Sequence, residues 1–525
     1  MVPCLEALCR ELLDKICEEV WYIDSKDKSH RSLIALAQTC KALHDPALDV
    51  YYAEVTGVKA LFMMLPRECW MIEGEVLNLT RMLQLIDWES FERNSHRVRS
   101  FIQPNEPLEV HDEALKAACY CPHGPLLPNL QRLLWTNIDI FPGDFVRLLL
   151  GHNLIEVHLF GISKAFYPII SVMGVTCSSL EGFLVNLERD EDAEALRGVV
   201  EEVLPRIPRL ESLYLGFPSS PSLLQKAEGL PHLRELTIES LVDSDLITTN
   251  QNHNFSFPGL RRLRICHSPL NDTAKTLDRI GPWPTVSEFA CYVSTSDSAA
   301  ELKQIIQSVS SNFSPNHLSS MVLKAQRSST TPLDDPTQLP PVSMQSLQPL
   351  FSYVSLQELV IRTGVPLSLS DGDIKSIASS FPKLCVFNLG GGSIMHAHKW
   401  PTLLGLAYLV DSCPLLEEIH LSVNALRRPD LPPPKADYGR NRKITTLHLG
   451  CSPIKDSVYV SSFVSLLLPK LRSVNTVDFS DGLVEQVAER FSEEWKMVNK
   501  FLTVFQGREK YSERWSSNAR NASYK

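Results

Sequence analysis

One short apolar pattern recurs along most of this 525-residue chain, and it constrains the fold more than any other feature. Apolar residues occupy its first, fourth and sixth positions, as in Leu210, Leu213 and Leu215. The other copies begin at Leu130, Leu154, Leu180, Leu233, Leu260, Val286, Leu318, Leu356, Leu384, Leu416 and Ile444, with a degraded copy at Leu471. Most copies lie about 23 to 32 residues apart, a period that predicts one stacked supersecondary unit rather than several separate cores.

Each copy is predicted to be a short strand, followed by a turn and a helix. Apolar residues at alternate positions are typical of a strand with one buried face. A proline stands two residues before several copies, as at Pro208 and Pro382, where it ends the preceding helix. Helix-like stretches lie between strands, at residues 192–204, 298–309, 371–380 and 401–410. The sequence therefore predicts an α/β fold, an irregular solenoid or horseshoe with parallel strands.

The first 55 residues follow the pattern of short amphipathic helices. One apolar stripe consists of Leu5, Leu8, Leu12, Ile16 and Val20, and a second, beside it, of Cys9, Leu13 and Cys17. The polar residues 24–32 interrupt this pattern, and a second helix is expected over residues 33–43. A third is expected to begin at Asp45 and Pro46, because Asp is a good N-cap and proline suits the first helical position. Three such helices bury too little surface to be stable without a partner or the following domain.

These helices resemble an F-box, on the basis of residues 8–16, 33–43 and 47–52. In that family the three-helix unit docks onto a Skp-type adaptor, which links it to a cullin-RING ubiquitin ligase. The resemblance implies adaptor-binding residues at Leu8, Cys9, Leu12, Ile16, Leu33, Leu36, Cys40 and Leu43. The family's Leu-Pro at the start of the first helix is Leu8–Cys9 here. An alternative interpretation is a helical cap over the open end of the solenoid.

The repeats resemble the divergent leucine-rich repeats of fungal F-box proteins. The predicted domains are an F-box-like helical domain at 1–55, a linker region at 56–128, the solenoid at 129–480, a capping helix at 481–505 and a flexible tail at 506–525. Residues 98–102 of the linker region are a possible first strand. Within the solenoid, a Pro-, Ser- and Thr-rich stretch predicts a disordered insertion at 327–349, and residues 430–443 an exposed loop.

Charge and cysteine content limit the possible partners and compartments. The net charge of −10 argues against nucleic-acid binding, which needs a basic surface. The 13 cysteines are scattered and mostly lie in apolar stretches, which favours reduced, buried thiols. No apolar run approaches the roughly 20 residues that a membrane span needs, and charged residues interrupt the N-terminus where a signal peptide would be apolar. The sequence predicts a cytoplasmic or nuclear protein that binds no membrane.

Side chains that alternate with the buried positions of each strand are expected on the concave face of the solenoid. Aromatic, arginine and histidine side chains in these rows suit protein recognition. Arg261, Arg262 and Arg264 form a basic cluster suited to an acidic or phosphorylated segment. The predicted target-binding residues are Tyr214, Arg262, Arg264, His420 and His448. The alternative for each of them is an ordinary solvated position on a sheet.

Motifs for catalysis or cofactor binding are missing or incomplete. Cys119, Cys121 and His123 have metal-like ligand types, but no second pair of comparable spacing completes a zinc site. The glycines at 390–392 lack the Gly-Lys-Ser/Thr of a phosphate-binding loop, and His396 and His398 lack an acidic companion at helical spacing. The sequence therefore predicts no enzyme, no cofactor and no metal ligands.

The favoured hypothesis is a substrate-recognition subunit of an SCF-type ubiquitin ligase. The F-box would bind the Skp-type adaptor, and the solenoid would hold a protein substrate of unknown identity near a charged ubiquitin carrier. The alternative is a leucine-rich-repeat interaction scaffold that is not coupled to ubiquitination, a hypothesis motivated by the missing proline at Cys9. An enzyme with an unrecognised site ranks below both.

Overall fold

The structure is a computed structural model that describes most of residues 9–505. The parts of that range left out are 24–25, 123, 137–142, 188–192, 242–254, 256, 267, 294–297, 326–340, 363–364, 366, 390–398, 428–440, 451 and 477–490. The chain forms two compact units, Met1–Thr248 (unit 1) and Thr249–Lys525 (unit 2).

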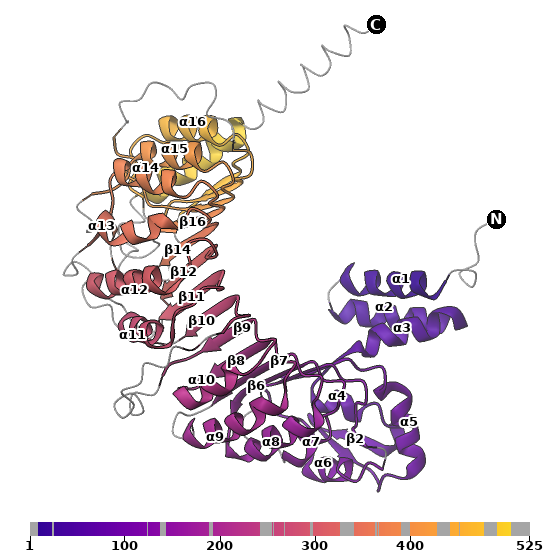
Figure 1. The fold of residues 1–525 in the computed structure, drawn as a ribbon. Coiled ribbons are helices and arrows are strands. Elements are labelled where there is room, and N and C mark those ends of the chain that lie inside the picture. The colour runs from indigo at the N-terminus through magenta and orange to yellow at the C-terminus, as the bar shows by residue number, and fades with distance from the viewer. Residues whose placement is uncertain are drawn as a thin grey trace, which may run out of the picture. The chain divides into compact units, whose positions relative to one another are not determined.

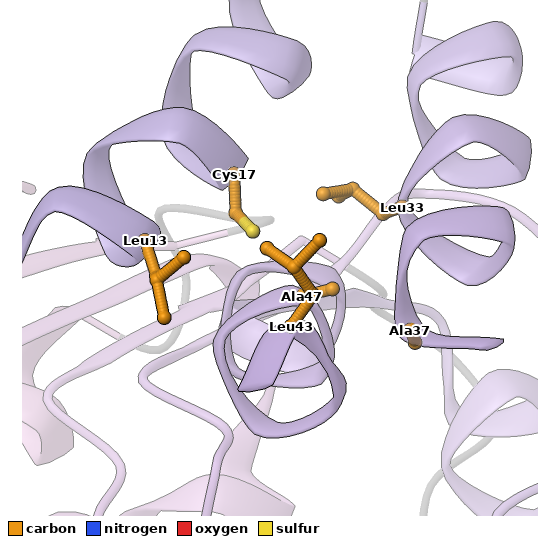
Figure 2. Close-up of a cluster of buried hydrophobic side chains, with 6 residues drawn as sticks. All are labelled: Leu13, Cys17, Leu33, Ala37, Leu43 and Ala47. Atoms are coloured by element: carbon orange, nitrogen blue, oxygen red, sulfur yellow. The ribbon is translucent and has the colours of Figure 1, made fainter. Parts of the chain in front are cut away.

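Unit 1 begins with three helices, α1 (Arg10–Ile23), α2 (Lys26–Thr39) and α3 (Lys41–Ala53). They pack around a cluster of buried side chains, which Figure 2 shows: Leu13, Cys17, Leu33, Ala37, Leu43 and Ala47. Leu13 and Cys17 of the second apolar stripe therefore face the core. Of the first stripe, Val20 packs against this core, whereas Leu12 and Ile16 are exposed. We call these three helices the helical module.

The starts of α2 and α3 differ from the prediction. α3 begins at Lys41, directly after an extended Cys40, and Pro46 lies inside the helix. The earlier start places Leu43 in the core, which offsets the backbone hydrogen bond that proline cannot make. α2 begins within the polar stretch that was expected to interrupt the helices. Ser29 is buried there and donates a hydrogen bond to the backbone oxygen of Trp21 at 3.0 Å.

The repeats of unit 1 form a ladder of parallel strands in chain order. The strands are β1 (Glu54–Thr56), β4 (Ser100–Gln103), β5 (Arg132–Trp135), β6 (Glu156–Ile162), β7 (Gly182–Leu187), β8 (Ser212–Gly216) and β9 (Glu235–Ile238). The apolar residue at the fourth position of one copy pairs with the equivalent residue of the next copy, as Phe183 does with Leu213 and Leu213 with Leu236. The possible strand at 98–102 is β4, and β1 precedes it, so the ladder begins before the predicted solenoid.

Helices alternate with these strands and lie on one side of the ladder (Figure 1). They are α4 (Val58–Phe62), α5 (Leu85–Ser95), α6 (Asp112–Ala118), α7 (Gly143–Arg147), α8 (Tyr167–Thr176), α9 (Ala193–Val203) and α10 (Pro221–Glu228). The short 3-10 helices are Arg67–Cys69, Lys164–Phe166 and Leu204–Arg206. A separate hairpin, β2 (Trp70–Glu73) with β3 (Val76–Leu79), is antiparallel.

Unit 2 has the same arrangement, with parallel strands in chain order. The strands are β10 (Arg262–Cys266), β11 (Glu288–Val293), β12 (Ser320–Ala325), β14 (Glu358–Arg362), β16 (Val386–Leu389), β17 (Glu418–His420), β18 (Thr446–His448) and β19 (Ser473–Asn475). The helices are α11 (Leu270–Ile280), α12 (Ala299–Asn312), α13 (Met344–Leu347), α14 (Asp371–Ser380), α15 (Leu403–Ser412), α16 (Ser457–Leu467) and one over residues 491–505. The strand of the degraded last copy is β19.

Unit 2 contains four further predicted segments: the disordered insertion, the exposed loop, the capping helix and the tail. Residues 327–340 of the predicted insertion lie outside the described residues, but 341–349 are not disordered. They form β13 (Val342–Ser343), which pairs with β15 (Leu367–Ser368), then α13 and the start of a 3-10 helix, Gln348–Ser352, because Val342 and Leu347 are buried. Most of the predicted loop 430–443, the start of the capping helix and the tail also lie outside the described residues.

The predicted fold class is confirmed: three N-terminal helices are followed by an irregular α/β repeat solenoid with parallel strands. The apolar positions of the pattern are buried in both units, as Leu213 and Leu215 are in β8 and Leu263 and Ile265 in β10. Among the described residues, no helix is long and apolar enough to cross a membrane.

Candidate protein-binding surfaces

The outer side of α1 carries apolar side chains that the helical module does not cover. Leu12 is 47% exposed and Ile16 is 37% exposed, and Cys9, just before the helix, is exposed as well. Their spacing of three and four residues places these three on one side of the helix, and we call them the α1 face. Their neighbours Leu13 and Cys17 are buried in the core (Figure 2). α1 therefore has two apolar sides, of which only one is used inside the module.

α1 begins without the proline that the F-box family has at this point. The backbone oxygen of Cys9 accepts hydrogen bonds from the N–H groups of Leu12 and Leu13, at 3.1 and 3.3 Å. Arg10 then links the start of the helix to its surroundings, with an ion pair to Asp14 at 2.8 Å and another to Asp49 on α3 at 2.5 Å. The first helical turn is held by these contacts instead.

Four of the remaining predicted adaptor-binding residues lie in the module core or pack against it. Leu33 and Leu43 are buried in the module core, so they hold the helices together rather than face a partner. Leu36 and Cys40 are partly buried against the same core. Leu8 lies outside the described residues. The predicted adaptor-binding residues therefore include both exposed side chains of the α1 face and buried side chains of the module core.

Arg97, which sequence reasoning missed, joins the helical module to the first repeats. It follows α5 and is 11% exposed, and its guanidinium donates to the carboxylates of Asp45, at 2.7 Å, and Asp49, both on α3. The hydrogen bond from Arg97 holds the pKa of Asp45 below its usual value. No sequence motif marks Arg97, because its partners lie about 50 residues earlier in the chain.

In unit 1, the strand side chains that alternate with the buried positions form a row across the ladder. His158, Leu184, Tyr214 and Thr237 occupy paired positions on β6, β7, β8 and β9. Tyr214 is half-buried, and Gly216 leaves the space that its ring uses, because a Cβ at Gly216 would lie 2.9 Å from the Cε1 atom of Tyr214. Burial lowers the pKa of His158. The predicted site residue Tyr214 therefore lies in a continuous row.

The corresponding row of unit 2 runs along the paired positions of its whole ladder, and we call it the unit 2 row. It consists of Arg264, Ala290, Val322, Val360, Asn388, His420, His448 and Asn475. Arg264 is exposed. Arg262, in the neighbouring row, is paired with Glu288 of the next strand at 2.8 Å, so part of the predicted basic cluster is neutralised within the sheet.

His420 and His448 are neighbours near the C-terminal end of the unit 2 row, and their side chains are in direct contact. Their rings are stacked, with centroids 3.9 Å apart and an interplanar angle of 9°. The Nε2 atom of His420 also lies 2.5 Å from the Oε1 atom of Glu418. Glu418, His420 and His448 together have ligand-type atoms within 4.8 Å of one another. The sequence predicted no metal ligands, yet a signal was present: Glu-x-His in one repeat and His at the equivalent position of the next.

Of the other candidate residues, only Cys119 and Cys121 lie in the described part of the chain. Cys119 and Cys121 are half-buried, and burial raises the pKa of the Cys119 thiol. His123, the glycines at 390–392, His396 and His398 lie outside the described residues.

No protein-family model matches this sequence, and no curated protein matches it either. Solved structures give distant matches. An internalin from Listeria monocytogenes has 18% identity and a TM-score of 0.35, with 67% of this chain and 82% of that chain covered. The yeast Rad7 and Elc1 complex has 13% identity and a TM-score of 0.38, with 64% of this chain and 81% of that chain covered. The mouse RP105/MD-1 complex has 13% identity and a TM-score of 0.37, with 74% of this chain and 63% of that chain covered. The repeat fold described above rests on the strand order and register of this chain itself.

Proposed function

We propose that this chain is the substrate-recognition subunit of an SCF-type cullin-RING ubiquitin ligase. The α1 face binds a Skp-type adaptor. The row of strand side chains through Tyr214 in unit 1 and the unit 2 row, together called the outward rows, bind the protein to be modified. The partner assignment rests on the F-box resemblance of residues 8–16, 33–43 and 47–52. The observation that carries the proposal is the exposure of Leu12 and Ile16 on a helix whose other apolar side is already buried.

The energetics of the α1 face favour a protein partner. Full burial of a leucine or isoleucine side chain contributes about 1.5 to 3 kcal/mol relative to leaving it exposed. Leu12 and Ile16 lie one helical turn apart, so one groove of a partner can cover both. The core residues Leu13 and Cys17 are not needed for that contact, so the module can keep its fold while it binds.

The mechanism needs no catalytic side chain from this protein. An adaptor-bound ligase supplies the charged ubiquitin carrier, and the repeat units hold the target beside it. Holding both on one assembly replaces a bimolecular encounter with an effectively intramolecular one, which raises the local concentration of the target's lysines.

The target-binding surface is assigned to the outward rows because they combine an aromatic residue, arginine and histidines on rigid strands. Tyr214, Arg264, His420 and His448 are the candidates there. Arg264 carries more of the predicted basic character than Arg262, since Arg262 is paired with Glu288. A charge reversal at Arg264 is expected to change the set of captured proteins, whereas an unchanged set would remove the basic cluster from the proposal.

The adaptor assignment is tested by co-purification of the full chain with a Skp-type adaptor. The variants Leu12→Asp and Ile16→Asp are expected to lose the adaptor, because a carboxylate would be buried in an apolar contact. Leu466→Asp is the matched control, since Leu466 is also an exposed leucine on a helix, α16. Equal adaptor recovery from the wild type, Leu12→Asp and Leu466→Asp would end the proposal.

A second candidate is an interaction scaffold without a ligase, which the exposed Cys9 in place of the family's proline favours. The two functions differ in what happens to the bound protein. A ligase subunit lowers the abundance of its target, and proteasome inhibition restores it. A scaffold leaves that abundance unchanged under inhibition, although it captures the same protein.

A further inference from the structure

Two neighbouring strands of unit 2 place three metal-ligating side chains on one face. Glu418 and His420 are two residues apart on β17, so they point to the same side of the sheet. His448 on β18 is the paired neighbour of His420. Strands lie about 4.8 Å apart, and residues two apart on one strand are separated by roughly 7 Å, so side chains at these positions can converge on one point.

We propose that Glu418, His420 and His448 form a binding site for a divalent transition-metal ion of the zinc class. Their ligand-type atoms already lie within 4.8 Å of one another. Two imidazoles and one carboxylate form a ligand set that suits Zn²⁺, and three protein ligands leave a fourth position open. The site shares His420 and His448 with the proposed target-binding surface but no residue with the α1 face, so metal binding is tested separately from adaptor binding.

Small side-chain rotations separate the present arrangement from a coordinating one. In a tetrahedral site with Zn–N bonds of about 2.0 Å, ligand atoms lie roughly 3.3 Å apart. The stacked rings of His420 and His448 must tilt so that one nitrogen of each points at the ion. The contact between His420 Nε2 and Glu418 Oε1, at 2.5 Å, is then replaced by two bonds to the metal.

Asn388 lies beside the site, where its side chain can orient a histidine ligand. Asn388 is the paired neighbour of His420 on the other side, on β16, and it is 6% exposed. Its Oδ1 atom has no hydrogen-bond partner among the described residues. Histidines that bind metals usually donate their second N–H to such an oxygen, which fixes the ring. In the metal-bound form we assign that acceptor to Asn388.

The site is tested by titrating the full chain with Zn²⁺ against a chromophoric chelator. The wild type is expected to bind one Zn²⁺ ion through Glu418, His420 and His448. His448→Ala and Glu418→Gln are each expected to weaken that binding at least tenfold, and Asn388→Leu to weaken it less. Melting curves of His448→Ala and Glu418→Gln in the presence of chelator should match that of the wild type, because neither side chain belongs to the buried core.

The chain offers a matched control in unit 1. Glu156 and His158 on β6 have the same Glu-x-His spacing, but the paired neighbours of His158 are Leu134 and Leu184, which are not ligands. His158→Ala is therefore expected to leave Zn²⁺ affinity unchanged. Equal affinity of the wild type and His448→Ala would overturn the proposal. A thiolate charge-transfer band in the Co²⁺-loaded wild type would overturn it too, because it would place the ion on cysteine.

Discussion

The side-chain amide of Asn499 makes two hydrogen bonds with the backbone of Val474. Its Oδ1 atom accepts from the Val474 N–H at 2.8 Å, and its Nδ2 atom donates to the Val474 oxygen at 2.9 Å. Val474 lies in β19, the last strand of the ladder in the described part of the chain. A strand edge leaves N–H and C=O groups unpaired and open to other chains. Asn499, from the helix over residues 491–505, closes this edge as a neighbouring strand would.

Asn499→Leu is expected to open the edge of β19. Both hydrogen bonds are lost, and each is worth about 0.5 to 1.5 kcal/mol net. Amide hydrogen exchange in residues 473–475 should become about 10- to 100-fold faster, because the strand opens more often. Asn499→Asp keeps the acceptor and loses the donor, so an intermediate rate is expected. Equal exchange in all three proteins would mean that Asn499 does not close the edge.

Leu12 and Leu13 are adjacent, so alanine substitutions at these two positions compare the two sides of α1. Leu13 is 4% exposed and lies in the module core, whereas Leu12 is 47% exposed. Leu13→Ala is expected to destabilise the helical module by about 2 to 4 kcal/mol, and Leu12→Ala by less than about 1 kcal/mol. Limited proteolysis of the full chain, with cleavage mapped to residues 10–53, measures the difference. If both variants were cleaved equally fast, the two apolar sides would not have the assigned roles.

The ion pair between the buried Asp87 and the exposed Arg81 predicts a local loss of stability in acid. Arg81 donates two hydrogen bonds to the Asp87 carboxylate, at 2.6 and 2.8 Å, and the backbone N–H of Gln84 donates a third. The hydrogen bonds from Arg81 hold the pKa of Asp87 well below its usual value. A depressed carboxylate pKa stabilises the fold above the unfolded pKa of about 3.9, and this stabilisation is lost as the pH falls toward the folded value.

Asp87→Asn tests that pair, because it keeps the shape and removes the charge. At pH 6 it is expected to destabilise α5 by about 2 kcal/mol, read from hydrogen exchange of residues 85–95. The difference from the wild type should shrink by about 1.4 kcal/mol per pH unit below pH 4, since the wild type then takes up a proton on unfolding. Glu113→Gln, at an exposed position, is the control and should show no such trend. A difference that is constant from pH 6 to pH 3 would contradict the assignment.

Gly216→Ala is expected to displace Tyr214 without unfolding β8. An added Cβ would lie 2.9 Å from Tyr214 Cε1 and 2.8 Å from the Cβ atom of Asn186, both closer than van der Waals contact. The Tyr214 ring must rotate away and β7 must shift slightly at Asn186, at a cost of about 1 to 3 kcal/mol. A changed fluorescence emission of Tyr214 relative to a Tyr214→Phe background, with an unchanged far-UV circular dichroism spectrum, would show the displacement. Identical spectra would mean that the ring does not depend on Gly216.

Local sequence patterns predicted most of the ladder and little of the candidate surfaces. The strands were predictable because each repeat carries its own alternation, as Leu213 and Leu215 do around Tyr214. The start of α3 was not, because the contact of Leu43 with the module core outweighs the local preference of Asp45 and Pro46. The weaker copies at Val286 and Leu318 were predictable for the same reason, because they keep apolar residues at the same three positions.

The sequence by itself determined that the chain stacks short parallel strands, since that depends on apolar residues a few positions apart. The tertiary structure alone decided which side of α1 stays uncovered, because Leu12 and Leu13 are equally apolar and only the packing of α2 and α3 distinguishes them. It also decided that Glu418, His420 and His448 meet. Their convergence depends on the register between β17 and β18, a relationship between residues of different repeats that no single segment encodes.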